Sequence, residues 1–276
     1  MTDSTRLVAG ASPISACILL LASWSLQASE QPDAVGSDPA SLMDRSWRST
    51  LVTGADSKAT FVLTGDNGAQ QIRKVSSYMK LQAGKTDNRR MTRFDFPADA
   101  RGIATLLIDH TGADDELWLY IPAAKKVRRV VASDKKSSFM GTDLSYGDVL
   151  GYKVSAWSHR LTGEDVVDGR KCRVVESTPT SDSVRDDSGY SKRQTCVDDA
   201  TSVALKIDIW DIDGKPLKTI WNRSIEPVNG QQGVFVAREI DAKNLQSGHS
   251  TKITIDDFNP TKSIPEDQFS PRALEE

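Results

Sequence analysis

The spacing of apolar residues along the chain changes from helical to alternating near residue 50. Before this point Ala40, Leu42, Met43 and Trp47 recur at the spacing of an amphipathic helix. The preceding run Ser37-Asp38-Pro39 combines a capping residue with a proline, which is typical of a helix start. We therefore expect one short helix that ends near Trp47.

The alternating pattern predicts β-strands over the rest of the chain. Ala59, Phe61 and Leu63 alternate with polar residues, as in a strand with one buried face. The runs Gly65-Asp66-Asn67-Gly68 and Asp211-Ile212-Asp213-Gly214 have the composition of hairpin turns. We expect strands near 59–63, 70–82, 91–96, 103–108, 117–121, 127–131, 153–162, 170–177, 189–197, 203–211, 217–225, 233–241 and 251–258.

These elements predict a mainly β (α+β) fold built on a curled antiparallel sheet. Short turns make consecutive strands antiparallel, and about a dozen twisted strands curl rather than stay flat. The concave apolar face of such a sheet must be covered by another element. The N-terminal helix and the loop that contains Phe139 and Met140 are the candidates for this cover.

The loop at 137–143 places two large apolar side chains, Phe139 and Met140, among polar residues. It is followed by a helical turn expected at 144–149. Phe139 and Met140 are either a plug for the core or part of the mouth of a binding site, and the sequence leaves both interpretations open. The polar run at 179–188 is expected to be a loop, and the tail near 263–269 is expected to be irregular with Phe269 buried.

The first 37 residues are interpreted as export and leader segments. Residues 17–26 form an apolar run that is too short to span a bilayer, with Arg6 upstream and small residues after it. We predict a signal peptide at 1–28 that is cleaved near Ala28, a flexible leader at 29–37 and a single domain at 38–276. Cys17 ends a run that imitates a lipoprotein box, but the apolar core follows this cysteine instead of preceding it, so we do not expect lipidation.

Two cysteines, Cys172 and Cys196, remain after removal of the signal peptide. An even pair in an exported chain predicts a disulfide, which would stabilise the fold by about 3 kcal/mol in the chain-entropy model. The alternative is a redox or metal-binding pair, but the chain has no CxxC motif and no histidine close to either cysteine. A structural disulfide is therefore the preferred interpretation.

Composition and motifs point away from nucleic-acid binding and from catalysis. The 276 residues include 26% charged side chains, and the net charge is -3. His110, His159 and His249 have no partner at metal-ligand spacing, and neither a nucleophile elbow nor a phosphate loop is present. We expect no catalytic residue, no metal and no cofactor.

One basic patch is formed by Lys125, Lys126, Arg128 and Arg129. Charged residues of this kind often protect an exposed sheet edge from pairing with other strands. The alternative is a docking face for an acidic partner or for anionic lipid head groups.

Several motifs in order along the chain carry a resemblance to a known family. They are Phe96-Pro97…Gly102, Leu117-Trp118-Leu119-Tyr120-Ile121-Pro122-Ala123…Lys126-Val127-Arg128-Arg129, Ser138-Phe139-Met140-Gly141-Thr142-Asp143, Tyr190-Ser191-Lys192…Leu205-Lys206…Asp213-Gly214…Leu217-Lys218 and Ile264-Pro265…Phe269. With these motifs the chain resembles the LolA-like, outer-membrane lipoprotein-sorting-type periplasmic proteins. It resembles more closely the branch associated with resistance-nodulation-division (RND/MMPL) exporters.

This resemblance implies an unclosed half β-barrel with a helix and loop lid over the concave face. It implies a periplasmic, non-enzymatic carrier for lipid, lipoprotein or other hydrophobic cargo that works with an inner-membrane RND-type exporter. We expect a monomer that makes at most peripheral membrane contact. By alternation and by the family's layout, the cavity is predicted to be lined by Phe61, Leu63, Met91, Phe94, Phe139 and Met140.

Two alternatives to the carrier remain at this stage. The first is a non-carrying accessory subunit of an envelope transport complex, which would dock through 125–129. The second is a secreted hydrolase, and a buried His110 or His159 paired with both an acid and a serine would indicate it.

Overall fold

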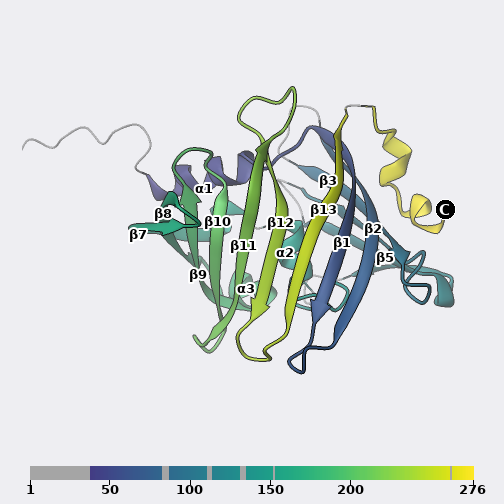
Figure 1. Ribbon diagram of the computed structural model, residues 1–276, viewed down its shortest axis with the longest axis horizontal. Coiled ribbons are helices and arrows are strands. Elements are labelled where there is room, and N and C mark those ends of the chain that lie inside the picture. The colour runs from purple at the N-terminus through teal and green to yellow at the C-terminus, as the bar shows by residue number, and fades with distance from the viewer. Residues whose placement is uncertain (1–37, 83–86, 111–113, 131–134, 152, 262) are drawn as a thin grey trace, which may run out of the picture. The chain divides into compact units, whose positions relative to one another are not determined.

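The computed structural model describes residues 38–82, 87–110, 114–130, 135–151, 153–261 and 263–276 (Figure 1). The predicted signal peptide, its cleavage near Ala28, Cys17 and the leader at 29–37 lie outside these residues.

Thirteen strands in the described part of the chain form one antiparallel sheet, which is not closed into a barrel. Their order is β6-β5-β4-β3-β2-β1-β13-β12-β11-β10-β9-β8-β7. The predicted fold class, an unclosed half β-barrel of antiparallel strands, is therefore confirmed. The strands are β1 Gly54–Thr64, β2 Gln70–Leu81, β3 Asn88–Phe96, β4 Ala104–Ile108, β5 Glu116–Ile121, β6 Lys126–Val130, β7 Trp157–Val167, β8 Arg170–Pro179, β9 Tyr190–Asp198, β10 Ala204–Asp211, β11 Pro216–Pro227, β12 Phe235–Asn244 and β13 Ser250–Pro260.

The sheet is a meander whose two edge strands, β6 and β7, are consecutive in the chain. Pairing of β1 with β13 joins its two halves, with Phe61 opposite Ile253 in the register. Both predicted hairpin turns connect neighbouring strands, β1 to β2 and β10 to β11. Because β6 and β7 are both edges, the chain between them has to pass from one open edge of the sheet to the other.

The N-terminal helix α1, Pro39–Arg48, confirms the predicted helix start. The side chain of Asp38 accepts a hydrogen bond from the backbone N–H of Ser41 at 2.9 Å, and Pro39 opens the first turn. Leu42 and Met43 are almost fully buried in a small cluster with two valines from β8 and β9. The helix is thereby fixed to the half of the sheet that ends at β7.

The lid, residues 135–151 between the two edge strands, contains helix α2, Tyr146–Leu150. This helix starts with a capping box. The Ser145 side chain accepts from the Asp148 N–H at 3.0 Å, and the Asp148 carboxylate accepts from the Ser145 N–H at 2.8 Å. Figure 1 shows α1 and α2 on the same side of the sheet, behind the strands β9 to β13 in that view.

Strands β4 and β5 pack against apolar clusters on both faces. Neighbouring residues alternate between two clusters: Leu107 and Leu117 belong to the large one, whereas Leu106 belongs to a second. The second cluster is covered by the C-terminal tail, which forms the 3-10 helices η4 Glu266–Phe269 and η5 Pro271–Glu275. The yellow tail lies beside β2 in Figure 1.

Two segments that we expected to be irregular contain short helices. The polar run at 179–188 includes helix α3, Asp182–Ser188, which is capped by the Ser181 side chain. The tail buries Ile264, Ala273 and Leu274 in addition to the predicted Phe269. Two further 3-10 helices, η1 Pro122–Ala124 and η3 Val154–Ala156, flank β5 and β7.

Candidate functional site

The large apolar cluster lies between the concave face of the sheet and the lid. Strands from both halves of the sheet contribute to it, and Phe139, Leu144, Tyr146 and Leu150 enter it from the lid. Its buried members are Ala59, Phe61, Leu63, Val75, Phe94, Leu107, Leu117, Leu119, Val130, Phe139, Leu144, Tyr146, Leu150, Trp157, Tyr190, Ile209, Ile220, Ala242 and Ile253.

Five of the six predicted cavity residues meet in this cluster. Phe61, Leu63, Phe94 and Phe139 are buried in it, and Met140 packs against it. Met91 lies in the second cluster, under the C-terminal tail, because it is three residues from Phe94 on the same strand and points to the other face. That cargo binds among the five residues on the concave face stays a prediction.

The lid fills the concave face with aromatic side chains. Phe139 is 3% exposed, and its ring meets the Tyr146 ring edge to face, with centroids 5.4 Å apart. In this arrangement Phe139 acts as a plug of the core, whereas Met140 remains half-buried. The two residues that the sequence treated as one pair therefore occupy different environments.

Polar contacts hold the first part of the lid to the sheet. The Arg73 guanidinium on β2 donates to the Met140 carbonyl. The Asp143 carboxylate accepts from the Thr251 hydroxyl at 2.6 Å and lies 2.7 Å from Nδ1 of His249. These contacts join the lid to β2, to β13 and to the turn before β13.

A buried ionic group, formed by Asp148, Lys218 and Tyr190, holds the second part of the lid. Asp148 Oδ2 lies 2.5 Å from Lys218 Nζ, and the Tyr190 hydroxyl donates to the same carboxylate at 3.0 Å. Lys218 Nζ also donates to the Asp143 carbonyl at 3.0 Å. Both charged side chains are at most 6% exposed, so a desolvated ion pair joins the lid to the sheet.

The pKa values of these three groups follow from burial and from their contacts. Burial favours the neutral form of Asp148, but Lys218 and Arg193 outweigh it and hold its pKa below the usual range. Burial likewise opposes the charge on Lys218, yet Asp148 raises its pKa. Burial and the Asp148 charge raise the pKa of Tyr190 to about 12. At neutral pH the group therefore holds a carboxylate, an ammonium and a neutral phenol.

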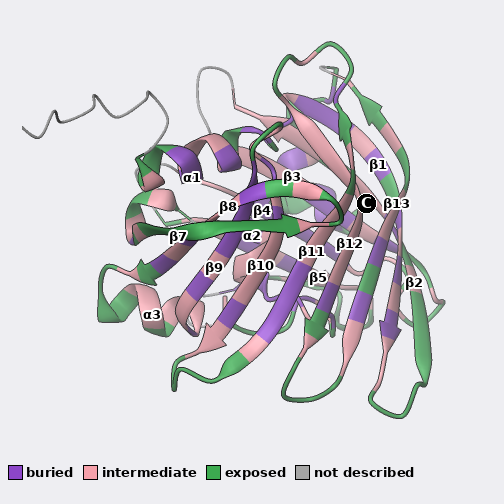
Figure 2. Ribbon diagram, turned by 60° about the vertical axis from the view of Figure 1, so that its left-hand side comes forward, coloured by how far each residue is buried: buried purple, intermediate pink, exposed green. Residues whose placement is uncertain are grey.

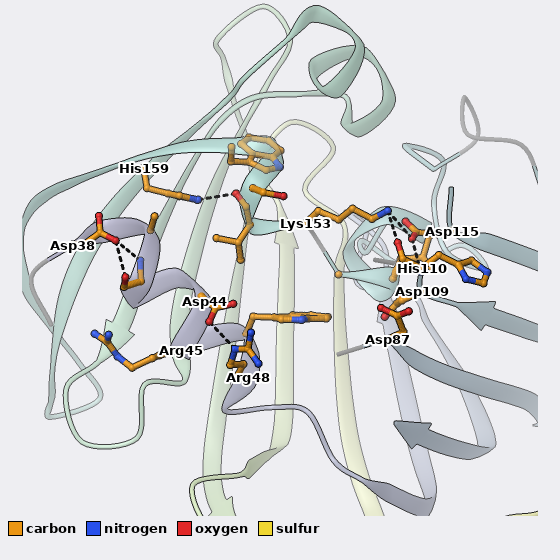
Figure 3. Close-up of a pocket in the computed structure, with 18 residues that line it drawn as sticks. Asp38, Asp44, Arg45, Arg48, Asp87, Asp109, His110, Asp115, Lys153 and His159 are labelled. Carbon is orange, nitrogen blue, oxygen red and sulfur yellow. Dashed lines mark hydrogen bonds and ion pairs between the residues drawn. The ribbon is translucent and has the colours of Figure 1, made fainter. Parts of the chain in front are cut away.

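An outer cavity of about 660 Å³ lies beside α1 (Figure 3). Its apolar walls include Trp47, Leu150, Val154 and Trp157, and this volume is within the range of small-molecule sites. Figure 3 shows Asp44 and Arg48 on the α1 side, with Asp87, Asp109 and Asp115 gathered on the opposite side.

The acidic side of the outer cavity contains a carboxyl group that titrates near neutrality. Burial raises the pKa of Asp109 to about 7, and the charge of Asp115 adds to the increase. Asp115 behaves differently. Burial favours its neutral form, but the His110 backbone N–H, Lys135 and Lys153 lower its pKa. The two lysine ammonium groups each lie 3.2 Å from this carboxylate.

Two further cavities lie on either side of the buried ionic group. An inner cavity of about 180 Å³ separates α1 from the sheet and is lined by Met43, Trp47, Asp148, Arg193 and Ile207, among others. A third cavity of about 580 Å³ lies between the lid and the β10–β11 turn, and Tyr190, Ile212 and Lys218 contribute to its walls.

The predicted docking residues Lys125, Lys126, Arg128 and Arg129 are all exposed at the edge of the sheet. Lys126, Arg128 and Arg129 belong to the edge strand β6, and the Arg129 guanidinium lies 5.9 Å from the centroid of the Trp118 ring. This placement is compatible with a protected edge and with a docking face, so the docking role stays a prediction.

The contacts of His110 and His159 bear on the hydrolase alternative. His159 lies 2.8 Å from the Ser177 hydroxyl and 3.0 Å from the Val154 carbonyl, and Ser177 is fully buried. His110 lies 3.1 Å from a Glu116 carboxylate oxygen. Within the described ranges, no group of three His, Cys, Asp or Glu side chains is placed to hold a metal ion.

Cys172 and Cys196 form the predicted disulfide. They lie on the neighbouring strands β8 and β9, with their Cα atoms 5.4 Å apart. The described residues contain no helix with the length and apolar character that crossing a bilayer requires.

Sequence reasoning missed Asp148, Lys218 and Tyr190 as residues of the site. A signal for Asp148 was present, since Ser145-Tyr146-Gly147-Asp148 matches the capping-box pattern. Tyr190 and Lys218 belong to the motifs that carry the family resemblance, but no local pattern indicates that they meet Asp148. Lys218 is 70 residues from Asp148 along the chain.

An open antiparallel half-barrel with a lid over an apolar concave face is the fold that this chain shares with LolA-like, outer-membrane lipoprotein-sorting-type structures. A protein-family model described as "Uncharacterized protein" matches residues 86–276, so the chain belongs to that family. No curated protein matches the chain in sequence.

Solved structures agree with this class. A domain described as outer membrane lipoprotein-sorting, from Vibrio parahaemolyticus, has a TM-score of 0.78 at 24% identity and covers 86% of this chain and 98% of that chain. A DUF1329 family protein from Desulfovibrio piger has a TM-score of 0.78 at 26% identity, over 86% of this chain and 100% of that chain. A LolA superfamily protein from Nitrosomonas europaea has a TM-score of 0.64 at 16% identity, over 84% of this chain and 97% of that chain.

Proposed function

We propose that this protein is a periplasmic, non-enzymatic carrier that binds lipid, lipoprotein or other hydrophobic cargo between its concave face and its lid. The observation that supports this proposal most strongly is that the contact between the lid and the sheet is apolar at its centre and polar around it. Phe139, Leu144 and Tyr146 fill the concave face with apolar surface, while the polar contacts of the lid lie around them.

Exchange of the lid side chains for an acyl chain is physically reasonable. Both are apolar, so the concave face stays covered when one replaces the other. Burial of about 15 methylene groups at roughly 0.8 kcal/mol each would contribute on the order of 12 kcal/mol before the costs of binding. The polar contacts of Arg73, Asp143 and Asp148 would have to break and re-form, which would give the carrier a closed and an open state.

Solved structures that share this fold also support the proposal. The structure from Vibrio parahaemolyticus is described as an outer membrane lipoprotein-sorting protein domain, and the chain shares its fold over nearly all of that domain. Function does not follow from fold alone, and the covered apolar face is the direct support for cargo binding by this chain.

Native mass spectrometry of the full chain, purified gently from a periplasm and followed by lipid extraction, tests the proposal. We expect co-purifying acyl-bearing mass that is lost in Met140→Asp, because this change places a charge at the half-buried tip of the lid. Met79→Asp is the matched control, since Met79 is also half-buried but packs in another cluster. Protein that is free of lipid and also rejects added lipid would contradict the carrier function.

A reversible lock tests the role of the lid. In the double variant Asp143→Cys with Thr251→Cys, a disulfide would replace a pair of hydrogen bonds between the lid and β13. We expect lipid uptake to stop under oxidising conditions and to return with a reductant. The wild type with and without the reductant controls for the native disulfide, and uptake by the locked variant would rule out lid opening.

We further propose that the carrier works as a monomer with an inner-membrane RND-type exporter and docks through Lys125, Lys126, Arg128 and Arg129. The exposed cations of an edge strand support this proposal, because a row of like charges complements an acidic surface. Charge reversal of Lys126 and Arg128 should abolish exporter capture in a pull-down while lipid binding persists. If Met140→Asp left exporter capture intact and the wild type carried no lipid, the non-carrying accessory subunit would be favoured.

A further inference from the structure

A row of hydroxyl side chains crosses the concave face of the sheet from β1 to β4. The strand register places its four members side by side: Ser57, Ser77, Thr92 and Thr105. Two residues from each member, on the same side of its strand, lies a buried residue of the large apolar cluster: Ala59, Val75, Phe94 and Leu107. The hydroxyl row therefore lies on the face that the lid covers.

The members of the hydroxyl row differ in their hydrogen bonding. The hydroxyls of Ser77 and Thr92 lie 3.0 Å apart and bond to each other. Thr105 is fully buried, and its Oγ1 has no hydrogen-bond partner among the described residues. A hydroxyl that leaves water without gaining a partner destabilises the state in which it is buried. The closed protein therefore leaves one hydrogen-bonding group of the row unused.

The hydroxyl row lies between a polar and an apolar part of the concave face. Arg90 precedes Thr92 by two residues on the same side of β3, and its guanidinium lies 3.5 Å from the Val149 carbonyl of α2. Phe94, on the other side of Thr92, belongs to the large apolar cluster together with Phe139 of the lid. A cargo that takes the place of the lid side chains would therefore contact both the row and the apolar surface beside it.

An uncharged hydrogen-bond acceptor suits this position better than an anion. The Thr105 hydroxyl can donate to a carbonyl oxygen. Arg90 already interacts electrostatically with Asp109, which gathers with Asp87 and Asp115 at the acidic side of the outer cavity (Figure 3), so the charges at this end of the face are not in positive excess. Burial of a hydrogen-bonded carbonyl costs less than burial of a charge without a free counter-charge.

We propose that the hydroxyl row binds the ester carbonyl groups of an acyl lipid, and that Thr105 donates to one of them the hydrogen bond that it lacks in the closed protein. The acyl chains then extend from the row over Phe94 and the apolar part of the concave face. This inference rests on the proposed carrier function and narrows its cargo to lipids whose chains are joined through ester carbonyls.

Binding of a diester lipid and a matched diether lipid to the delipidated full chain tests the inference. The probes are didecanoylglycerol and didecylglycerol, which have similar chains and differ in their carbonyl groups, and displacement of a neutral fluorescent probe measures their affinity. We expect the wild type to bind the diester at least tenfold more tightly, which corresponds to about 1.4 kcal/mol. In Thr105→Val this preference should fall below about threefold, while diether binding stays within about twofold.

Two further variants and a stability measurement keep the test decisive. Thr105→Ser retains the hydroxyl and should retain the preference for the diester. Thr254→Val removes a half-buried hydroxyl on the other side of β13 from Ile253 of the large apolar cluster, and it should also retain the preference. The urea midpoint of Thr105→Val should not fall below that of the wild type, because the lost hydroxyl has no partner. A lower midpoint would contradict the unused hydrogen bond.

The outcomes separate this inference from the carrier function. Equal binding of diester and diether by the wild type would overturn the inference and leave the carrier function intact. An unchanged preference in Thr105→Val would overturn the role of Thr105. If a phosphate group added to the diether raised its affinity as much as the carbonyl groups do, the site would be one for anions and the inference would be wrong. Failure of every lipid to bind would contradict both proposals.

Discussion

Gly151 is the backbone position at which helix α1 and the lid meet. It ends α2 with φ at 91°, a conformation that side chains other than glycine rarely adopt, and its missing Cβ leaves room for the Trp47 ring. The contact between α1 and the lid therefore depends on the absence of one methyl group.

Gly151→Ala should destabilise the protein by on the order of 2–5 kcal/mol, because backbone strain and overlap with Trp47 add together. Gly230→Ala is the matched control. Gly230 also has a positive φ, but no atom lies within 4 Å of its added Cβ, so only strain of about 1 kcal/mol is expected. Urea unfolding measures both, and equal losses would mean that the Trp47 contact is unimportant.

Asp109 makes stability depend on pH. Its pKa is about 7 in the folded protein and 3.8 as an ordinary aspartate, so the folded state binds a proton more tightly. Stability from this proton is fully present below pH 4 and is lost as the pH rises through 7. Asn cannot ionise, so the Asp109→Asn variant should not lose this stability. Between pH 4 and pH 8 its free energy of unfolding should rise relative to that of the wild type by on the order of 2–4 kcal/mol.

Urea unfolding of both proteins across this pH range measures the gain, and Asp213→Asn in an exposed turn should show no comparable effect. Parallel pH profiles for Asp109→Asn and the wild type would contradict the assigned burial of this carboxyl group.

At the scale of elements, the lid and the C-terminal tail decide which strands have two buried faces. The lid covers the concave side of β4 and β5, and the tail covers their other side. The tail is fixed by Arg93, which donates to the Ala273 carbonyl at 2.8 Å, and by Glu266, which pairs with Lys80 and Arg89. The tail should therefore contribute to the stability of the fold through both apolar packing and polar contacts.

Leu274→Ala should destabilise the protein by about 2–5 kcal/mol, since Leu274 is fully buried and the smaller side chain leaves a cavity. Arg272→Ala, two residues earlier and exposed, should change stability by less than about 0.5 kcal/mol. Thermal or urea unfolding compares the two variants. A loss below about 1 kcal/mol for Leu274→Ala would mean that the tail does not contribute to the stable core.

At the scale of the whole sheet, stability depends on how the two open edges are held. No strand pairs with the outer side of β6 or of β7 in the described sheet, and Figure 2 shows β7 as mostly exposed. The Cys172–Cys196 disulfide joins β8 to β9 near the β7 edge. It limits the conformations of the unfolded chain and ties the strands closest to this edge.

The double variant Cys172→Ser with Cys196→Ser should lose about 3 kcal/mol of stability. The urea midpoint should fall to that of the reduced wild type, and a reductant should have no effect on the variant. An unchanged midpoint would mean that strain in the folded state cancels the constraint on the unfolded one.

The sequence by itself determined the elements and their class. Most strand positions, the two hairpin turns, the Asp38 cap and the pairing of Cys172 with Cys196 followed from short patterns. The strand expected near 153–162 was misplaced, because Val154–Ala156 form a 3-10 helix and β7 runs from Trp157 to Val167. Alternation and turn composition act over a few residues, so they can be read without knowledge of distant neighbours. The predicted mature chain has two cysteines, so only one disulfide pairing within the chain is possible.

Only the tertiary structure decided which side of the sheet each residue faces and which charges meet. Alternation separates Met91 from Phe94, but it does not say which of the two faces the lid. The pairing of Asp148 with Lys218 and the high pKa of Asp109 depend on segments far apart in the chain and on burial. Desolvation and electrostatic pairing are properties of the folded environment, so they appear only when the sheet curls and the lid covers it.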